Sequence, residues 1–267
     1  MRLMCLFLLT VAVARSPCQA SPVPRHRLSV LFVGNSLTYV ANTPAVFDAI
    51  ATVNGAAVSS DMIVKGGATL TQRVNDGSIA RALGEKRYSA VVLQERGGDL
   101  ICAFGPDSCA DSRKAIHAIV ALAKDSGAKV YLLGTYQGNA AASKAIVEAE
   151  SSAAAEAGIP YLEVSEKLQA LKVSAPELAW QAPDGMHPGP SLALLNAVIL
   201  HHALFGTLPK PVALKVVAPI YGITSGLTEA LRGAEDAPPL AITPRSFEYS
   251  QNSLQIVLQS MHAGAGS

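Results

Sequence analysis

A short apolar run that passes directly into a glycine turn sets the first constraint on this chain. Residues 28–33 (Leu-Ser-Val-Leu-Phe-Val) are mostly apolar and include two β-branched valines, which is typical of a strand buried on both faces. Residues 34–38 (Gly-Asn-Ser-Leu-Thr) then form a polar turn. Ligands of open parallel sheets bind outside the carboxyl ends of the strands, so Ser36 is a candidate nucleophile. The alternative is that Ser36 caps the next helix, as serine often does.

The alternation of strands and helices continues along the chain. We expect further strands at residues 57–65, 90–93, 129–133 and 160–164. We expect helices at residues 43–55, 70–86, 108–125, 140–157, 164–171 and 191–205. This alternation predicts an α/β fold, in which a parallel sheet of about five strands lies in a three-layer α/β/α sandwich.

The N-terminus has the pattern of a secretory signal peptide. Arg2 precedes an apolar stretch, residues 3–14, that is too short to span a bilayer. Small residues allow cleavage after Ala14 or Ala20, and an uncleaved anchor is the alternative. We therefore expect a signal peptide over residues 1–20, one α/β domain over 21–205, and a proline-broken extension over 206–267 that packs on the core. The mature protein would be periplasmic or secreted.

Charge and hydropathy exclude several classes of partner. The formal net charge is +1, and no basic stripe with interleaved aromatic residues is present. This balance gives no electrostatic basis for binding nucleic acid or an anionic membrane. No stretch after the N-terminus is long and apolar enough for a membrane helix, so we expect no stable membrane insertion. The oligomeric state is left open.

Two of the four cysteines lie close together. Cys102 and Cys109 flank a Gly-Pro turn, and an oxidising compartment would favour a local disulfide between them. The alternatives are free thiols or a zinc site. Zinc would need two more soft ligands, and none lies near in the sequence, so we expect no metal.

Residues suited to hydrolysis converge on one edge of the expected sheet. Three successive strands end in turns that carry Ser36, Gly67 and Gln94, and a later loop carries Asp184 and His187. Ester hydrolysis by serine needs a hydroxyl, a base, a carboxylate that orients the base, and donors for the oxyanion. All four kinds of group are available on this edge.

Each of these residues has a predicted role and a simpler alternative. His187 would be the base and Asp184, three residues earlier, its orienting partner; alternatively they are a surface histidine and an aspartate at a helix N-terminus. The main-chain N–H groups of Ser36 and Gly67 and the side-chain amide of Gln94 would hold the oxyanion. Alternatively, Gly67 belongs to a plain tight turn.

The ordered set of motifs resembles the SGNH (GDSL-like) hydrolase superfamily. Its first block, usually Gly-Asp-Ser, would be residues 34–36, its second-block glycine Gly67, and its last block, Asp-x-x-His-Pro, residues 184–188. The resemblance implies a flavodoxin-like sandwich and a Ser-His-Asp esterase without metal or other cofactor. Two features depart from the pattern: Asn35 replaces the usual aspartate, and Val-Leu-Gln-Glu stands where Gly-x-Asn-Asp is usual. Some branches similarly have Gly-Asn-Ser and Leu-Gln-Glu.

These observations predict an exported serine esterase acting on a small-molecule or glycan ester, with removal of small acyl groups from carbohydrate as the first choice. One alternative is a lipase, arylesterase or thioesterase of the same fold. Another is a non-catalytic carbohydrate-binding or assembly protein that has kept the sandwich.

Overall fold

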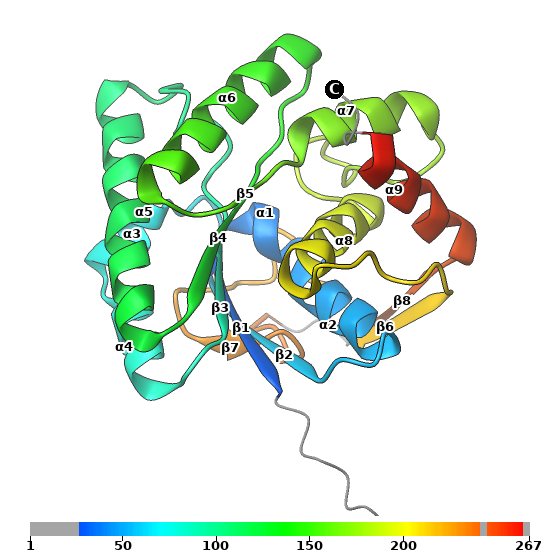
Figure 1. The fold of residues 1–267 in the computed structure, drawn as a ribbon, viewed down its shortest axis with the longest axis horizontal. Helices are drawn as coiled ribbons and strands as arrows, with labels where there is room; N and C mark the ends of the chain where they lie inside the picture. The colour runs from blue at the N-terminus through cyan, green and yellow to red at the C-terminus, as the bar shows by residue number, and fades with distance from the viewer. Residues whose placement is uncertain (1–26, 241–244, 264–267) are drawn as a thin grey trace, which may run out of the picture.

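A mainly parallel six-stranded sheet forms the centre of the molecule (Figure 1). The structure is a computed structural model and describes residues 27–240 and 245–263. The strand order is β5-β4-β3-β1-β2-β7. The strands of this sheet are β1 (Leu28–Gly34), β2 (Val58–Val64), β3 (Ala90–Leu93), β4 (Lys129–Leu133), β5 (Tyr161–Leu162) and β7 (Arg232–Gly233).

The five strands β1 to β5 run parallel, and β1 lies between β2 and β3. Gly34 is paired with Val64, and Val33 with Leu93, so these three strands end at the same edge of the sheet. Strands are added outward from β1 on both sides, which is the doubly wound arrangement. The predicted α/β sandwich is confirmed.

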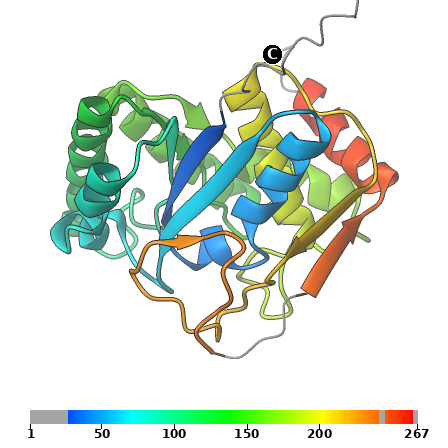
Figure 2. The same ribbon diagram turned by 90° about the horizontal axis from the view of Figure 1, so that it is seen from below.

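Helices cover both faces of the sheet (Figures 1 and 2). Leu31 and Val33 point to one face, where they share a core with α3, α4, α5 and α6; Val30 and Phe32 point to the other, with α2, α7, α8 and α9. All four side chains are fully buried, as expected for a strand covered on both faces. The helices are α1 (Ser36–Tyr39), α2 (Thr43–Val53), α3 (Leu70–Asn75), α4 (Ser78–Glu85), α5 (Pro106–Ser126), α6 (Ala140–Ala157), α7 (Ser165–Ser174), α8 (Pro190–Phe205) and α9 (Gln251–Ala263).

The sixth strand was not predicted from the sequence. β7 pairs antiparallel with β2, with Arg232 opposite Met62 and Gly233 opposite Asp61. It is an Arg-Gly pair without the apolar pattern that identifies a strand. The sheet therefore contains the five parallel strands that were expected and, in addition, one short antiparallel edge strand.

The part of the chain after α8 packs on the core. β6 (Leu214–Ala218) and β8 (Arg245–Tyr249) form a separate antiparallel pair. Leu214, Tyr249 and Leu254 are buried in the same apolar core as α2 and α8. This extension therefore shares a hydrophobic core with the sandwich.

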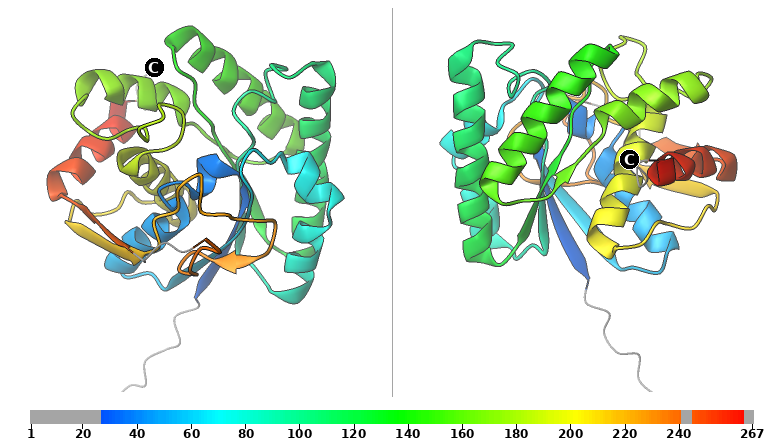
Figure 3. Two further views of the ribbon diagram at one scale, coloured as in Figure 1. Left: turned by 180° about the vertical axis from the view of Figure 1, so that it is seen from behind. Right: turned by 45° about the horizontal axis from the view of Figure 1, so that its top comes forward.

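Asn42 connects the extension to the segment that follows the first strand. It is 1% exposed and has a positive φ of 53°, a conformation that asparagine tolerates better than most residues. Its side chain accepts from Ala45 N (3.2 Å) and donates to the carbonyl oxygens of Pro219 (2.8 Å) and Ala234 (2.9 Å). Figure 3 shows the segment around residues 219–240, drawn in orange, running beside α1 and α2.

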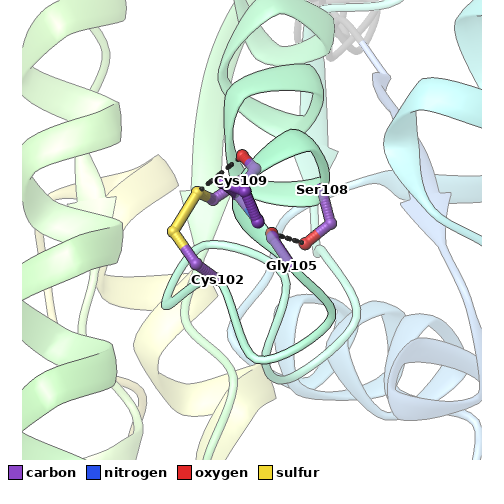
Figure 4. Close-up of a disulfide and its surroundings, with 5 residues drawn as sticks. Cys102, Gly105, Ser108 and Cys109 are labelled. Atoms are coloured by element: carbon purple, nitrogen blue, oxygen red, sulfur yellow. Dashed lines mark hydrogen bonds between the residues drawn. A yellow bond between two sulfur atoms is a disulfide. The ribbon is translucent and has the colours of Figure 1, made fainter.

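The predicted disulfide is present in the structure. Cys102 and Cys109 are bonded, with their Cα atoms 4.9 Å apart (Figure 4). The bond closes the loop that leads into α5, and Ser108 Oγ donates to Gly105 O (2.9 Å) in the first turn of that helix. The loop is therefore fixed by a covalent bond and by its own hydrogen bonds.

The predicted signal peptide, residues 1–20, lies outside the described residues. Among the helices of residues 27–240 and 245–263, none has both the length and the apolar character needed to cross a membrane.

We predict that Asn42→Ala lowers the free energy of unfolding by about 2–4 kcal/mol, because it leaves buried main-chain groups without partners. Urea unfolding measures this loss. The matched control is Asn139→Ala, which removes the single capping hydrogen bond of Asn139 to Ala142 N and should cost about 1 kcal/mol. An equal loss in the two variants would contradict the role given to Asn42.

Candidate active site

The turn after β1 presents Ser36 at the edge of the sheet. Asn35 caps α1, because its side-chain oxygen accepts from Leu37 N (3.0 Å), and Ser36 is the first residue of that helix. The alternative that Ser36 itself caps the helix is therefore wrong. The Ser36 side chain makes no hydrogen bond within the described residues, and Ser36 is 8% exposed. Its hydroxyl is thus left without a structural partner.

Asn35 also connects three turns at this edge of the sheet. Its side-chain nitrogen donates to Ala68 O (3.2 Å) and Gln94 O (3.4 Å), which an aspartate could not do. The single side chain thus joins the turns that follow β1, β2 and β3. Gly34 is required beside it, because a Cβ there would collide with Thr38 Oγ1.

A tight loop before α8 holds Asp184 against His187. Asp184 Oδ1 accepts from Met186 N (2.9 Å) and His187 N (3.0 Å), and Asp184 Oδ2 lies 2.7 Å from His187 Nδ1. These hydrogen bonds, led by the one from His187 N, lower the pKa of Asp184 to about 2. The carboxylate is therefore ionised at neutral pH and can only accept, which assigns the proton to Nδ1 and leaves Nε2 free as a base.

The loop is fixed from both sides. Ala182 N donates to His187 O (2.8 Å), and Tyr136 OH donates to Met186 O (2.5 Å). Trp180 is 4% exposed and its ring nitrogen donates to Ala175 O (2.8 Å), so it packs the loop on the core and does not form a wall for substrate.

Ser36 and His187 line the same open cleft of about 540 Å³. Gly67 lines it as well, with a φ of +68° that favours glycine and with open space where a Cβ would be. No hydrogen bond joins Ser36 Oγ to the His187 ring in the described part of the chain, a loose geometry that is common before substrate binds. The cleft is also lined by Asn35, Arg96, Tyr136, Gln137, Gln181 and Met186.

Gln94 does not take the position predicted for it. Its side chain is buried and does not line the cleft. Its amide nitrogen donates to Gly134 O (3.1 Å), and its amide oxygen accepts from Thr38 Oγ1 (2.8 Å). The amide therefore connects α1 to the turn after β4, and the prediction that it is aimed at an oxyanion is wrong.

Glu95 has a structural role that the sequence left open. It is 1% exposed, and its carboxylate accepts from Leu70 N (3.1 and 3.3 Å) and Arg96 N (2.9 Å). It thereby fastens the Gly67 turn, which leads into α3, to the end of β3. Burial, only partly offset by these hydrogen bonds, raises the pKa of Glu95 to about 7. In the sequence, the only sign of this role was a Gln-Glu pair that directly follows the expected strand over residues 90–93.

The described residues contain no cluster of three or more His, Cys, Asp or Glu side chains suited to a metal ion. The cleft combines a free hydroxyl, an oriented imidazole and main-chain N–H groups, and these are the groups that acyl transfer requires.

No protein-family model matches this sequence, and no curated protein matches it significantly. Solved structures do match. A protein from Slackia heliotrinireducens assigned to the SGNH hydrolases is 25% identical, with a TM-score of 0.54 over 66% of this chain and 97% of its own. The fold is that of the SGNH hydrolases.

Two further structural neighbours are more distant in sequence. A DUF4886 family protein from Bacteroides uniformis is 17% identical, with a TM-score of 0.55 over 68% of this chain and 84% of its own. A catalytic variant of an acetylxylan esterase from Geobacillus stearothermophilus is 13% identical, with a TM-score of 0.50 over 66% of this chain and 93% of its own. At these identities the likeness concerns the fold alone.

We predict that Glu95 makes the stability of the protein pH-dependent. The folded state holds the proton of Glu95 up to about pH 7, whereas the unfolded state releases it near pH 4.5. Stability is therefore lost as the pH rises through this window. Urea unfolding measures the free energy of unfolding at each pH. Relative to the wild type, this free energy should rise for Glu95→Gln by up to a few kcal/mol between about pH 5 and pH 8.

The matched control is Glu177→Gln, at an exposed position. The free energy of unfolding of this variant should differ from that of the wild type by the same amount at every pH between about 5 and 8. A constant difference for Glu95→Gln would show that the buried carboxyl does not titrate in this window.

Proposed function

We propose that this protein is an exported serine esterase of the SGNH superfamily that hydrolyses carboxylic esters. The observation that carries the proposal is the 2.7 Å contact between Asp184 and His187 in a cleft that also exposes the unpartnered hydroxyl of Ser36. The SGNH fold of the structural neighbours supports the same reaction class. No cofactor enters the mechanism.

In the acylation step, Ser36 Oγ attacks the ester carbonyl carbon while His187 Nε2 takes the hydroxyl proton. Asp184 stabilises the imidazolium that forms. The carbonyl oxygen becomes an oxyanion near the main-chain N–H groups of Ser36 and Gly67; that of Gly67 donates no hydrogen bond within the described residues. The tetrahedral intermediate then expels the alcohol, which receives the proton from His187, and an acyl-enzyme remains.

In the second step, water attacks the acyl carbonyl and gives its proton to His187. Collapse of this intermediate releases the carboxylic acid and returns the proton to Ser36 Oγ. Each oxyanion donor typically contributes about 3 kcal/mol to the lowering of the barrier.

A small acyl group on a carbohydrate is the proposed substrate class. The cleft is open, and its lining includes the polar side chains of Asn35, Gln137 and Gln181, which can bond to the hydroxyl groups of a sugar. Export is supported by the N-terminal sequence pattern and by the disulfide between Cys102 and Cys109, a bond typical of oxidising compartments.

We predict that Ser36→Ala and His187→Ala each lower turnover of para-nitrophenyl acetate by about 10⁴-fold or more, without loss of folding. An organophosphate should label the wild type and not Ser36→Ala. The control is Ser126→Ala, at the opposite edge of the sheet, which should keep both labelling and activity.

Several outcomes would change the proposal. A wild type that is neither labelled nor active on esters would indicate a binding or assembly protein. Faster turnover of long-chain than of short-chain para-nitrophenyl esters would indicate a lipase-like enzyme.

A further inference from the structure

Arg96 brings a guanidinium group to the cleft. It follows β3, lines the cleft together with Ser36 and His187, and its side chain is 35% exposed. Among the described residues that line the cleft, no Asp or Glu and no other Lys or Arg is present. A ligand bound at Ser36 therefore shares the cleft with one permanently charged side chain, the guanidinium of Arg96.

The guanidinium group is held in one orientation before any ligand arrives. Asp99, which is 1% exposed, accepts from Arg96 Nε (2.8 Å) and Nη2 (2.9 Å). The Phe104 ring lies 3.8 Å from Arg96 Cζ, within the loop closed by the disulfide of Cys102 and Cys109. Because the side chain is already ordered, little conformational entropy is lost when a ligand binds to it.

Part of the guanidinium remains available. Asp99 uses Nε and one N–H of Nη2, whereas Nη1 has no partner within the described residues and is not buried. A planar fork of free N–H donors matches the two oxygens of a carboxylate. Because Asp99 offsets the single positive charge of Arg96, the pair holds an anion through the free N–H donors, and this suits a monoanion better than a phosphate dianion.

We infer that Arg96 is a specificity-determining residue that binds a carboxylate carried by the ester substrate. This inference rests on the proposed function, and it narrows the substrate to acidic esters. The carboxylate can belong to the alcohol, as in an acylated acidic sugar, or to the acyl group, as in the half-ester of a dicarboxylic acid. The two sources share the same chemistry at Arg96.

The test compares acidic esters with neutral analogues by their ratio of kcat/KM. Para-acetoxybenzoate against its methyl ester probes a carboxylate on the alcohol side, and monoethyl succinate against ethyl butanoate probes the acyl side. We expect the wild type to prefer the acid about tenfold in at least one pair, as for one hydrogen bond to a charged group. The preference should appear mainly in KM and shrink at high ionic strength.

In Arg96→Gln the ratio should fall to about one, and Arg96→Lys should restore part of it because charge returns without the planar fork. The matched control is Arg87→Gln, an exposed arginine before β3 at the opposite end of that strand, which should keep the wild-type ratio. Loss of Arg96 leaves the buried Asp99 without its partner, so Arg96→Gln/Asp99→Asn provides a variant with a neutral pair if the single variant does not fold.

A wild-type ratio of about one in both pairs, or an unchanged ratio in the Arg96 variants, overturns the inference. Hydrolysis of the neutral esters that is lost in Ser36→Ala would show in the same experiment that the proposed function still holds. If the wild type hydrolyses none of the four esters, both the proposed function and the inference fail.

Discussion

The parallel pairing of β1 with β2 and β3 is the constraint on which the rest of the site depends. Because Gly34 is level with Val64, and Val33 with Leu93, the turns that follow these strands emerge side by side. The turns that carry Ser36 and Gly67 and the Gln-Glu-Arg segment after β3 are therefore neighbours, although they lie some thirty residues apart in sequence. A slip of one residue in this register would also exchange the two buried faces of β1.

Buried polar side chains then fix the distances between these turns. Asn35, Gln94 and Glu95 are each 1% exposed, and each bonds to turns other than its own. Gln94 and Glu95 do not line the cleft, whereas Asn35 does. Their shared effect is to satisfy main-chain groups that would otherwise be buried without partners. Asn35, Gln94 and Glu95 thus hold in place the turns that border the cleft.

The regular elements could be predicted from sequence because their signals are local. The ranges of β3, β4 and α6 agree with the periodicity and with the glycines that end the elements. The helix expected over residues 70–86 is two helices, since Gly77 adopts a positive φ between them. β7 was missed because its pairing with β2 is set by tertiary contacts, which two residues do not encode.

The convergence of Ser36 and His187 on one cleft followed from topology, but the role of Gln94 did not. A glutamine at a strand end can face the cleft or the core with the same local sequence. Contacts with Thr38 and Gly134 decide between the two, and both lie far along the chain. The role of Arg96 could not be predicted for the same reason, because its orientation depends on contacts with Asp99 and Phe104.

The hydrogen bonds of Asn42 have a consequence for how the chain folds. Its partners, Pro219 and Ala234, lie 177 and 192 residues further along the chain. A chain that ends at α8 would therefore leave the buried side chain of Asn42 without these two partners. The segment between α1 and α2 thus reaches its final packing only when the last part of the polypeptide has folded against it.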